Sequence, residues 1–135
     1  MPQFYPEIPA NLQEWALAQP VFFTASAPLV GAHINVSPKG IPSSTLAVIS
    51  PNCAAYLDAT GSGCETISHV YENGRITLMW CSFGKSPRIM RWFCTGKVVE
   101  HGDPGWGEWR GRFKSVEDGG VPSARAVIVL DVWKV

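Results

Sequence analysis

The stretch from residue 32 to residue 80 constrains the fold more than any other part of the chain. It consists of short runs of β-forming residues interrupted by Pro, Gly and an Asn-Gly pair, with one short helical pattern in the middle. Strands this close together pair through tight turns, which favours an antiparallel sheet. Polar side chains stand where these strands end, beside the start of the helix. The stretch therefore predicts a sheet with a candidate site for a phosphorylated ligand at one end.

The rest of the 135-residue chain extends the same pattern. Helices are predicted over residues 7–19, from residue 64 to about 71, and near residues 104–113. Strands are predicted over residues 21–27, 32–37, 45–50, 53–59, 75–83, 88–100 and 124–135. Six or seven strands with one helix midway predict a mainly β fold with short helices, a six-stranded antiparallel Greek-key β-barrel. We expect a single domain over residues 1–135, with the N-terminal helix in residues 1–19 and the barrel in residues 20–135.

Three local features refine this prediction. Asn11 is the predicted N-cap of the first helix. Gly96 interrupts the long strand and predicts a bulge or a bend there. The last strand ends without a polar tail, which indicates a fragment or a short family member.

The strand at residues 32–37 alternates between polar and apolar side chains. His33, Asn35 and Ser37 point to one side, and the apolar residues between them point to the other. Two interpretations stay open: the polar side faces solvent, or it faces a polar site. Residues 38–44 are predicted to be a loop, and Lys39 within it is either a solvated lysine or a ligand contact.

Charge and hydropathy limit the partners. Charged residues make up only 16% of the chain, against about 25% in typical soluble domains. A surface this poor in charge suggests that a second copy of the chain covers part of it. The net charge is zero and Lys and Arg do not cluster, so nucleic-acid binding is not expected. No apolar run approaches the roughly 20 residues that cross a membrane.

Four cysteines stand at positions 53, 64, 81 and 94, without the short spacings of zinc sites. No secretory signal precedes them. We expect reduced, mostly buried thiols in a cytoplasmic protein, and no metal site.

The start of the mid-chain helix permits two interpretations. Thr60 or Ser62 can cap it, and Glu65 follows Ser62 at the spacing of a capping box. Free N–H groups at a helix start also attract anions. Glu65 in the first turn opposes a tightly held anion, because the two negative charges repel.

Residues 20 to about 114 resemble the pyridoxamine 5'-phosphate oxidase-like proteins, the FMN-binding split-barrel superfamily. The likeness lies in residues 33–40, 56–63, 65–69, 74–78 and 87–98, including the signatures N-V-S-P-K-G and T-G-S-G-x-E-T of a largely fungal branch. The resemblance implies a split barrel that forms a homodimer, with FMN at the subunit interface. It places Lys39 at a basic strand end facing flavin or substrate. By the same resemblance, we expect residues 56–58 to line the flavin ring and Arg91 to take a position that touches the flavin.

The chain departs from the oxidases of this family at three places. Glu65 and Thr66 stand in place of the Arg-Lys pair that holds phosphate at the helix start, and Ile34 or His33 replaces the first basic residue of the preceding strand. The C-terminal Trp and Arg that hold pyridoxal have no counterpart. Losing two charge-assisted contacts should cost about 1.5–3 kcal/mol each. Pyridoxamine phosphate oxidase activity itself is therefore not expected.

Three hypotheses follow. The first is an FMN-dependent oxidoreductase of unknown substrate, in which the cofactor carries the redox chemistry. Its candidate cofactor-binding residues are Asn35, Ser37, Lys39, Tyr56, Asp58, Thr60, Ser62, Thr66 and Arg91. The second is a cofactor-free or weakly ligand-binding split-barrel dimer, which Glu65 favours. The third places haem or a deazaflavin in the same groove, beside His33 or His69.

Overall fold

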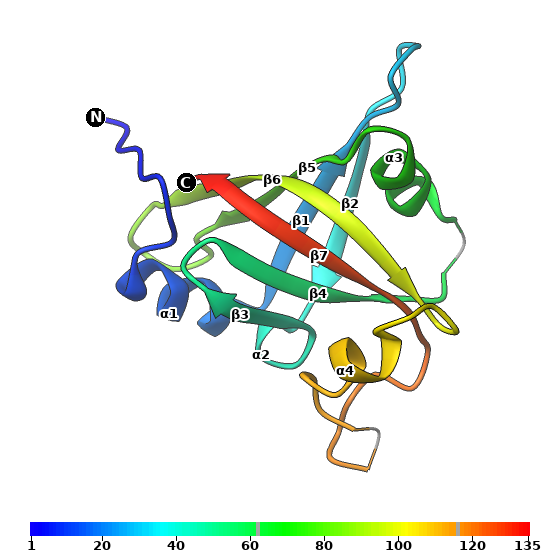
Figure 1. The fold of residues 1–135 in the computed structure, drawn as a ribbon. Coiled ribbons are helices and arrows are strands. Elements are labelled where there is room, and N and C mark those ends of the chain that lie inside the picture. Colours follow the sequence, from blue (N-terminus) through cyan, green and yellow to red (C-terminus); the bar gives the residue numbers. More distant parts are fainter. Residues whose placement is uncertain (62, 116) are drawn as a thin grey trace.

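The structure is a computed structural model that describes residues 1–61, 63–115 and 117–135. It is mainly β, with seven strands and four short helices in that part of the chain (Figure 1). The strands are β1 (Val21–Ser26), β2 (Asn35–Gly40), β3 (Leu46–Ser50), β4 (Cys53–Ala59), β5 (Arg75–Cys81), β6 (Ile89–Glu100) and β7 (Ala124–Lys134). The helices are α1 (Ala10–Ala18), α2 (Pro42–Thr45), α3 (Glu65–Asn73) and α4 (Trp106–Arg110).

All strand pairs are antiparallel, in the order β2-β1-β5-β6-β7-β4-β3. The sheet curls until its two ends approach each other, so that β2 passes behind β4 in Figure 1. This confirms the antiparallel split-barrel prediction. The sheet has seven strands rather than the predicted six. Its edge strands, β2 and β3, each pair with one neighbour only.

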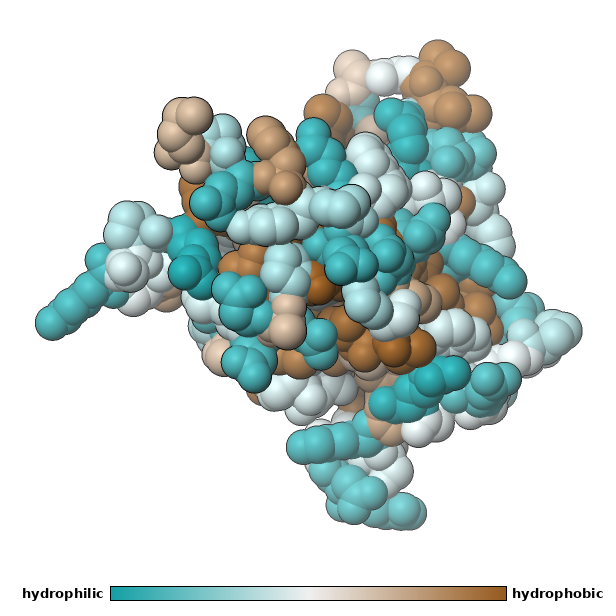
Figure 2. Space-filling model, turned by 60° about the vertical axis from the view of Figure 1, so that its left-hand side comes forward, coloured by the Kyte–Doolittle hydropathy of each residue, from teal (hydrophilic) through white to brown (hydrophobic). Residues whose placement is uncertain are grey.

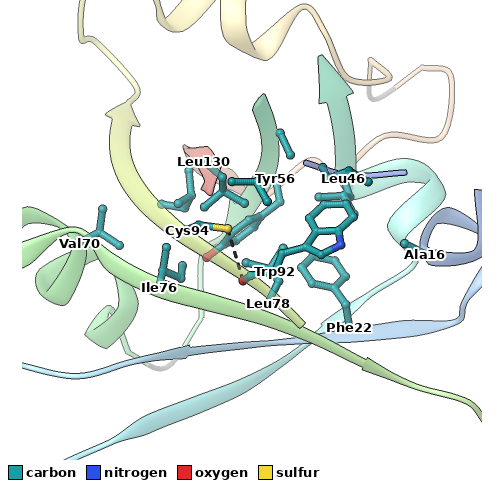
Figure 3. Close-up of a cluster of buried hydrophobic side chains, with 14 of the residues drawn as sticks. Ala16, Phe22, Leu46, Tyr56, Val70, Ile76, Leu78, Trp92, Cys94 and Leu130 are labelled. Atoms are coloured by element: carbon teal, nitrogen blue, oxygen red, sulfur yellow. Dashed lines mark hydrogen bonds between the residues drawn. The ribbon is translucent and has the colours of Figure 1, made fainter. Parts of the chain in front are cut away.

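Aromatic rings fill the inside of the curl (Figure 3). The rings of Trp80 and Trp92 lie 4.5 Å apart between centroids, and Phe22 stacks on Trp80 at 5.7 Å. Tyr56 meets Phe22 edge-on at the same separation. All four residues are fully buried. Such rings supply much of the apolar surface that stabilises a small domain.

A smaller cluster occupies the outer face of β4, β6 and β7. Leu57, Val99 and Val127 are buried there, with Trp106 and Trp109 of α4 packed against them. Because side chains alternate across a strand, Tyr56 and Asp58 point into the curl while Leu57 points to α4. The position of Asp58 follows from this alternation.

The N-terminal segment is tied to the end of β7. The backbone groups of Tyr5 and Val135 exchange two hydrogen bonds of 2.9 and 2.8 Å. Helix α1 begins at Ala10 with Pro9 before it, so the prediction of Asn11 as N-cap is wrong. Among the described residues, no helix combines the length and hydrophobicity needed to cross a membrane.

Two predictions between residues 32 and 44 are corrected. The strand begins at Asn35 rather than near Ala32, and Pro38, Lys39 and Gly40 continue it instead of forming a loop. The proline is tolerated because β2 is an edge strand that needs ladder bonds on one side only. The remaining residues of the predicted loop form α2.

Gly96 marks close packing rather than a bulge. The register of β6 against β7 shifts between Phe93 and Cys94. A Cβ at position 96 would lie 3.1 Å from the Ile76 Cγ2 and 3.2 Å from the Val70 Cγ1. Glycine is therefore needed where α3 presses onto the sheet.

We expect Gly96→Ala to lower the free energy of unfolding by about 1–3 kcal/mol, because the added methyl overpacks this contact. Urea unfolding monitored by tryptophan fluorescence measures the change. Gly107→Ala on α4 is the matched control, since a Cβ there meets no atom of the described chain within 4 Å. That control should be neutral or stabilising by up to about 1 kcal/mol. Equal unfolding midpoints for the wild type and Gly96→Ala would contradict the packing argument.

Candidate functional site

Strand β2 turns its polar side chains inward. Asn35, Ser37 and Lys39 are half-buried, whereas Val36 between them is 60% exposed. An edge strand over an apolar interior normally shows the opposite alternation. Of the two interpretations left open by the sequence, the polar site is therefore the one that the fold supports.

Strands β4 and β7 contribute an acid and a base at the same end of the curl. Asp58 is 2% exposed on β4. On β7, the residues paired with Asp58 and Ala59 are Ala126 and Ala124, so Arg125 is the extra residue of a β-bulge. A bulge re-aims its side chain. Here it directs Arg125 toward Asp58 instead of along the regular alternation of the strand.

The buried carboxylate holds two cations. Lys39 Nζ lies 3.1 Å from Asp58 Oδ1, and Arg125 Nε lies 2.8 Å from Asp58 Oδ2. The hydrogen bond to Asp58 raises the pKa of Arg125 above its usual value. Since Lys39 comes from one edge of the sheet and Asp58 from the far side, this ion pair bridges the open seam of the barrel.

Asn35 donates hydrogen bonds to two hydroxyl groups beside these charges. Its Nδ2 donates to Ser37 Oγ at 3.1 Å and to Thr66 Oγ1 at 3.2 Å. A hydroxyl that accepts from an amide keeps its own hydrogen for another acceptor. No acceptor for either hydrogen occurs within residues 1–61, 63–115 and 117–135. Asn35 thus sets both hydroxyls as donors.

The connection between β4 and α3 forms the rim. Arg125 Nη2 donates to the Gly63 carbonyl at 2.6 Å, and the Thr60 N–H donates to the Ser123 carbonyl at 2.7 Å. A side chain at Gly63 would overlap the Glu65 carboxylate, which folds back beside it. Cys64 is the N-cap residue of α3, and no side-chain cap occurs among the described residues, so Thr60 is not the cap. The predicted cap Ser62 lies outside the described residues.

Together these groups line a pocket of about 190 Å³. Its lining includes Ser37, Lys39, Asp58, Glu65, Thr66 and Arg125. Two cations and two hydroxyl donors suit the oxygens of a phosphate. The residues present therefore fit the phosphate end of a flavin nucleotide, although Asp58 and Glu65 reduce the positive charge available to it.

The structure brings together five of the nine residues proposed from the sequence: Asn35, Ser37, Lys39, Asp58 and Thr66. Tyr56 is fully buried, with Lys39 Nζ 5.9 Å from its ring centroid, so it forms the floor beneath the lysine rather than a ligand contact. Burial raises the pKa of its phenol well above the usual range. Thr60 is exposed on the rim. Ser62 lies outside the described residues.

Arg91 is elsewhere. It lies on β6 in a separate cleft, which it shares with Phe93 and the N-terminal residues Gln3 and Phe4. Arg125, by contrast, belongs to the pocket and was missed from the sequence. The available signal was weak: a single arginine at the start of a strand that is otherwise apolar over residues 126–130.

The histidines and cysteines do not form a metal centre. No group of three potential ligands from His, Cys, Asp and Glu meets in the described parts of the chain. His69 Nδ1 is 2.8 Å from the Ser26 hydroxyl, which ties α3 to β1. His33 is exposed ahead of β2. All four cysteines are free, but only Cys94 is buried, so the prediction of mostly buried thiols is wrong.

Comparison with known proteins identifies a relative of this chain. No family model matches it. Over all 135 residues it is 56% identical to the Aspergillus flavus protein named pyridoxamine 5'-phosphate oxidase family protein ustO. The chain is therefore similar over its whole length to a protein of the pyridoxamine 5'-phosphate oxidase family. It spans about half the length, 53%, of that fungal relative.

Solved structures share the fold at low sequence identity. A candidate pyridoxamine 5'-phosphate oxidase of Lactobacillus delbrueckii superposes with a TM-score of 0.71 at 15% identity, over 96% of this chain and 93% of that one. An FMN-binding protein of Syntrophomonas wolfei gives a TM-score of 0.60 at 12% identity, over 87% and 76%. At these identities the likeness concerns the fold alone.

Proposed function

We propose that this oxidase-like split barrel binds FMN and acts as a flavin-dependent oxidoreductase on a substrate that the sequence does not name. The main support for this proposal is the pocket in which Lys39, Arg125 and two oriented hydroxyl groups converge. The FMN-binding protein with the same fold supports the choice of ligand. When bound, FMN supplies the electron transfer, and the protein supplies binding and electrostatics.

The residues of the pocket have different roles in binding the phosphate. Lys39 and Arg125 attract the phosphate, and Ser37 and Thr66 donate hydrogen bonds to it. Asn35 is a positioning residue that acts through these two hydroxyls. Asp58 holds the two cations in place from beneath. A pocket of about 190 Å³ accommodates the phosphate end and not a whole flavin, so the ring must extend beyond it.

A second copy of the chain completes the site in this proposal. Large apolar side chains are exposed on and around the β1–β2 connection, and Figure 2 shows hydrophobic surface at the top of the view, where this connection protrudes. The residues are Leu29, Val30, Ile34 and Val36, at 60–88% exposure. Such a patch marks an interface. Arg91, which lies outside the pocket, would then reach the flavin from the partner subunit. We place this homodimer in the cytoplasm, in keeping with its free cysteines.

A second candidate function is a split-barrel dimer that binds a ligand weakly or carries no cofactor. Asp58 already pairs with both cations, and the Glu65 carboxylate folds over the rim. An incoming phosphate must compete with the first and is repelled by the second. These two acidic groups are the observation that favours this alternative.

Titration with FMN separates the two candidates. Under the first, the purified protein is yellow, or it quenches FMN fluorescence with a saturable dissociation constant. A protein that stays colourless and leaves FMN fluorescence unchanged at excess cofactor supports the second.

Lys39→Ala should weaken FMN binding about 10-fold, because one charge-assisted contact is lost. Lys97→Ala on β6 is the control, since this lysine does not line the pocket. Fluorescence titration of both variants measures the effect. Equal affinities for Lys39→Ala and the wild type would remove Lys39 from the site.

A further inference from the structure

We infer that the pocket selects an anion with one negative charge over a doubly charged phosphate, and that Asp58 imposes this selection. The inference rests on the proposed function, because it concerns the charge of the group that the same pocket holds. It differs from a phosphate site built only of cations and hydroxyls, where the dianion binds best.

The charge count of the pocket is the first argument. The charged and titratable side chains lining it come from every surrounding element: Lys39 of β2, Asp58 of β4, Cys64 and Glu65 at the start of α3, and Arg125 of β7. The charges of the two cations and the two carboxylates cancel. Glu65 is exposed, so solvent weakens its repulsion of an anion, whereas Asp58 is 2% exposed and acts at nearly full strength. The effective charge is therefore close to that of one cation, which balances one negative charge.

Hydrogen bonding gives the second argument. Each carboxylate oxygen of Asp58 already accepts a hydrogen bond from a cation. A dianion offers more acceptors and adds repulsion with this carboxylate. A phosphate monoester that keeps one proton brings an O–H donor, for which a carboxylate oxygen with a second lone pair is a matching acceptor.

A pair of flavins that differ only in the charge of the end group tests the inference. FMN carries a phosphate monoester with a second pKa of about 6, so about three quarters of it is singly charged at pH 5.5 and about 3% at pH 7.5. Riboflavin 5'-sulfate carries one charge at both values. We expect the FMN dissociation constant to rise about 20-fold from pH 5.5 to pH 7.5, in proportion to the loss of the singly charged form. Riboflavin 5'-sulfate should bind equally at both.

The two ligands share the flavin ring, so a histidine that titrates elsewhere would change both dissociation constants by the same factor. That factor cancels in the ratio of the FMN and riboflavin 5'-sulfate dissociation constants. FMN binding more tightly than riboflavin 5'-sulfate at pH 7.5 would overturn the inference while leaving the proposed function intact. Failure of both flavins to bind at either pH counts against the proposed function. In that case, titrations with methyl phosphate and with methyl sulfate make the same comparison for the pocket alone. The NMR signal of Arg125 Nε reports binding. Tighter binding of methyl phosphate than of methyl sulfate at pH 7.5 rejects the inference.

Asp58→Asn identifies the residue responsible. It raises the charge of the pocket by one, so FMN should bind at pH 7.5 at least as tightly as at pH 5.5, and more tightly than riboflavin 5'-sulfate. Asp103→Asn is the matched control, since Asp103 is exposed in the turn after β6 and does not line the pocket. If the folded Asp58→Asn protein shows the same ratio of FMN to riboflavin 5'-sulfate dissociation constants as the wild type, Asp58 does not cause the selection. If that variant does not fold, the comparison of the two flavins on the wild type still decides whether the selection exists.

Discussion

Replacing Asn35 by aspartate should reduce FMN affinity about 1000-fold. The carboxylate accepts where the amide donates, so the hydroxyl hydrogens of Ser37 and Thr66 turn toward residue 35 and away from the pocket. Each hydrogen bond to a charged group contributes about 1.5–3 kcal/mol, and two are lost. The new negative charge also lies in a half-buried site, where repulsion of an anion is strong. Fluorescence titration with FMN measures the loss.

Two further variants separate this effect from general damage. Asn35→Ala removes the amide but leaves both hydroxyls free to rotate, so its loss should be about 10-fold, well below that of Asn35→Asp. Gln13→Glu adds the same charge on α1, outside the pocket, and should bind FMN like the wild type. Thermal unfolding of each variant checks that the fold is retained. If Asn35→Ala and Asn35→Asp lose the same affinity, the amide does not orient the hydroxyls.

The architecture was accessible from the sequence because it depends on local signals. Alternation, Pro and Gly positions predicted the strands and every described helix except α2. The boundaries of β4, β6 and β7 agree with the prediction within one or two residues. At β2 the local rule failed. Pro38 indicated a loop, but an edge strand tolerates proline, and whether a strand lies at an edge is decided by the order of the whole sheet.

The site was predictable where it follows the alternation of one strand. Asn35, Ser37 and Lys39 share a face of β2 by spacing alone. Tyr56 and Asp58 share a face of β4 in the same way, yet one is core and the other lines the pocket. Spacing gives the face of a strand, but the depth of each position within the curled sheet depends on tertiary packing.

Arg125 could not be placed from spacing at all. Its direction comes from a bulge in the pairing of β7 with β4, strands far apart in the sequence. The register of such a pair depends on the packing of both strands against the core. One cation of the pocket was therefore not recognisable in the sequence of the last strand.

Arg125→Ala should lower FMN affinity about 100-fold. Three effects act in the same direction. One of the two pocket cations is lost, Asp58 keeps only Lys39 as a partner, and the Gly63 carbonyl loses the donor that holds the rim. Loss of one charge-assisted contact accounts for about 1.5–3 kcal/mol, and about 1.4 kcal/mol corresponds to each factor of ten.

The conservative variant distinguishes charge from geometry. Arg125→Lys keeps the positive charge, but a single ammonium cannot reproduce the fork that reaches Asp58 Oδ2 and the Gly63 carbonyl together. We expect it to recover about half of the lost binding free energy. Arg112→Ala is the control, because that arginine forms an exposed ion pair with Glu108 near α4, outside the pocket. If Arg125→Ala binds FMN as Arg112→Ala does, the phosphate does not bind beside β7, and Lys39 alone would have to account for any affinity. That outcome would also remove the charge balance on which selection by Asp58 depends, so this variant tests the cation pair that both proposals share.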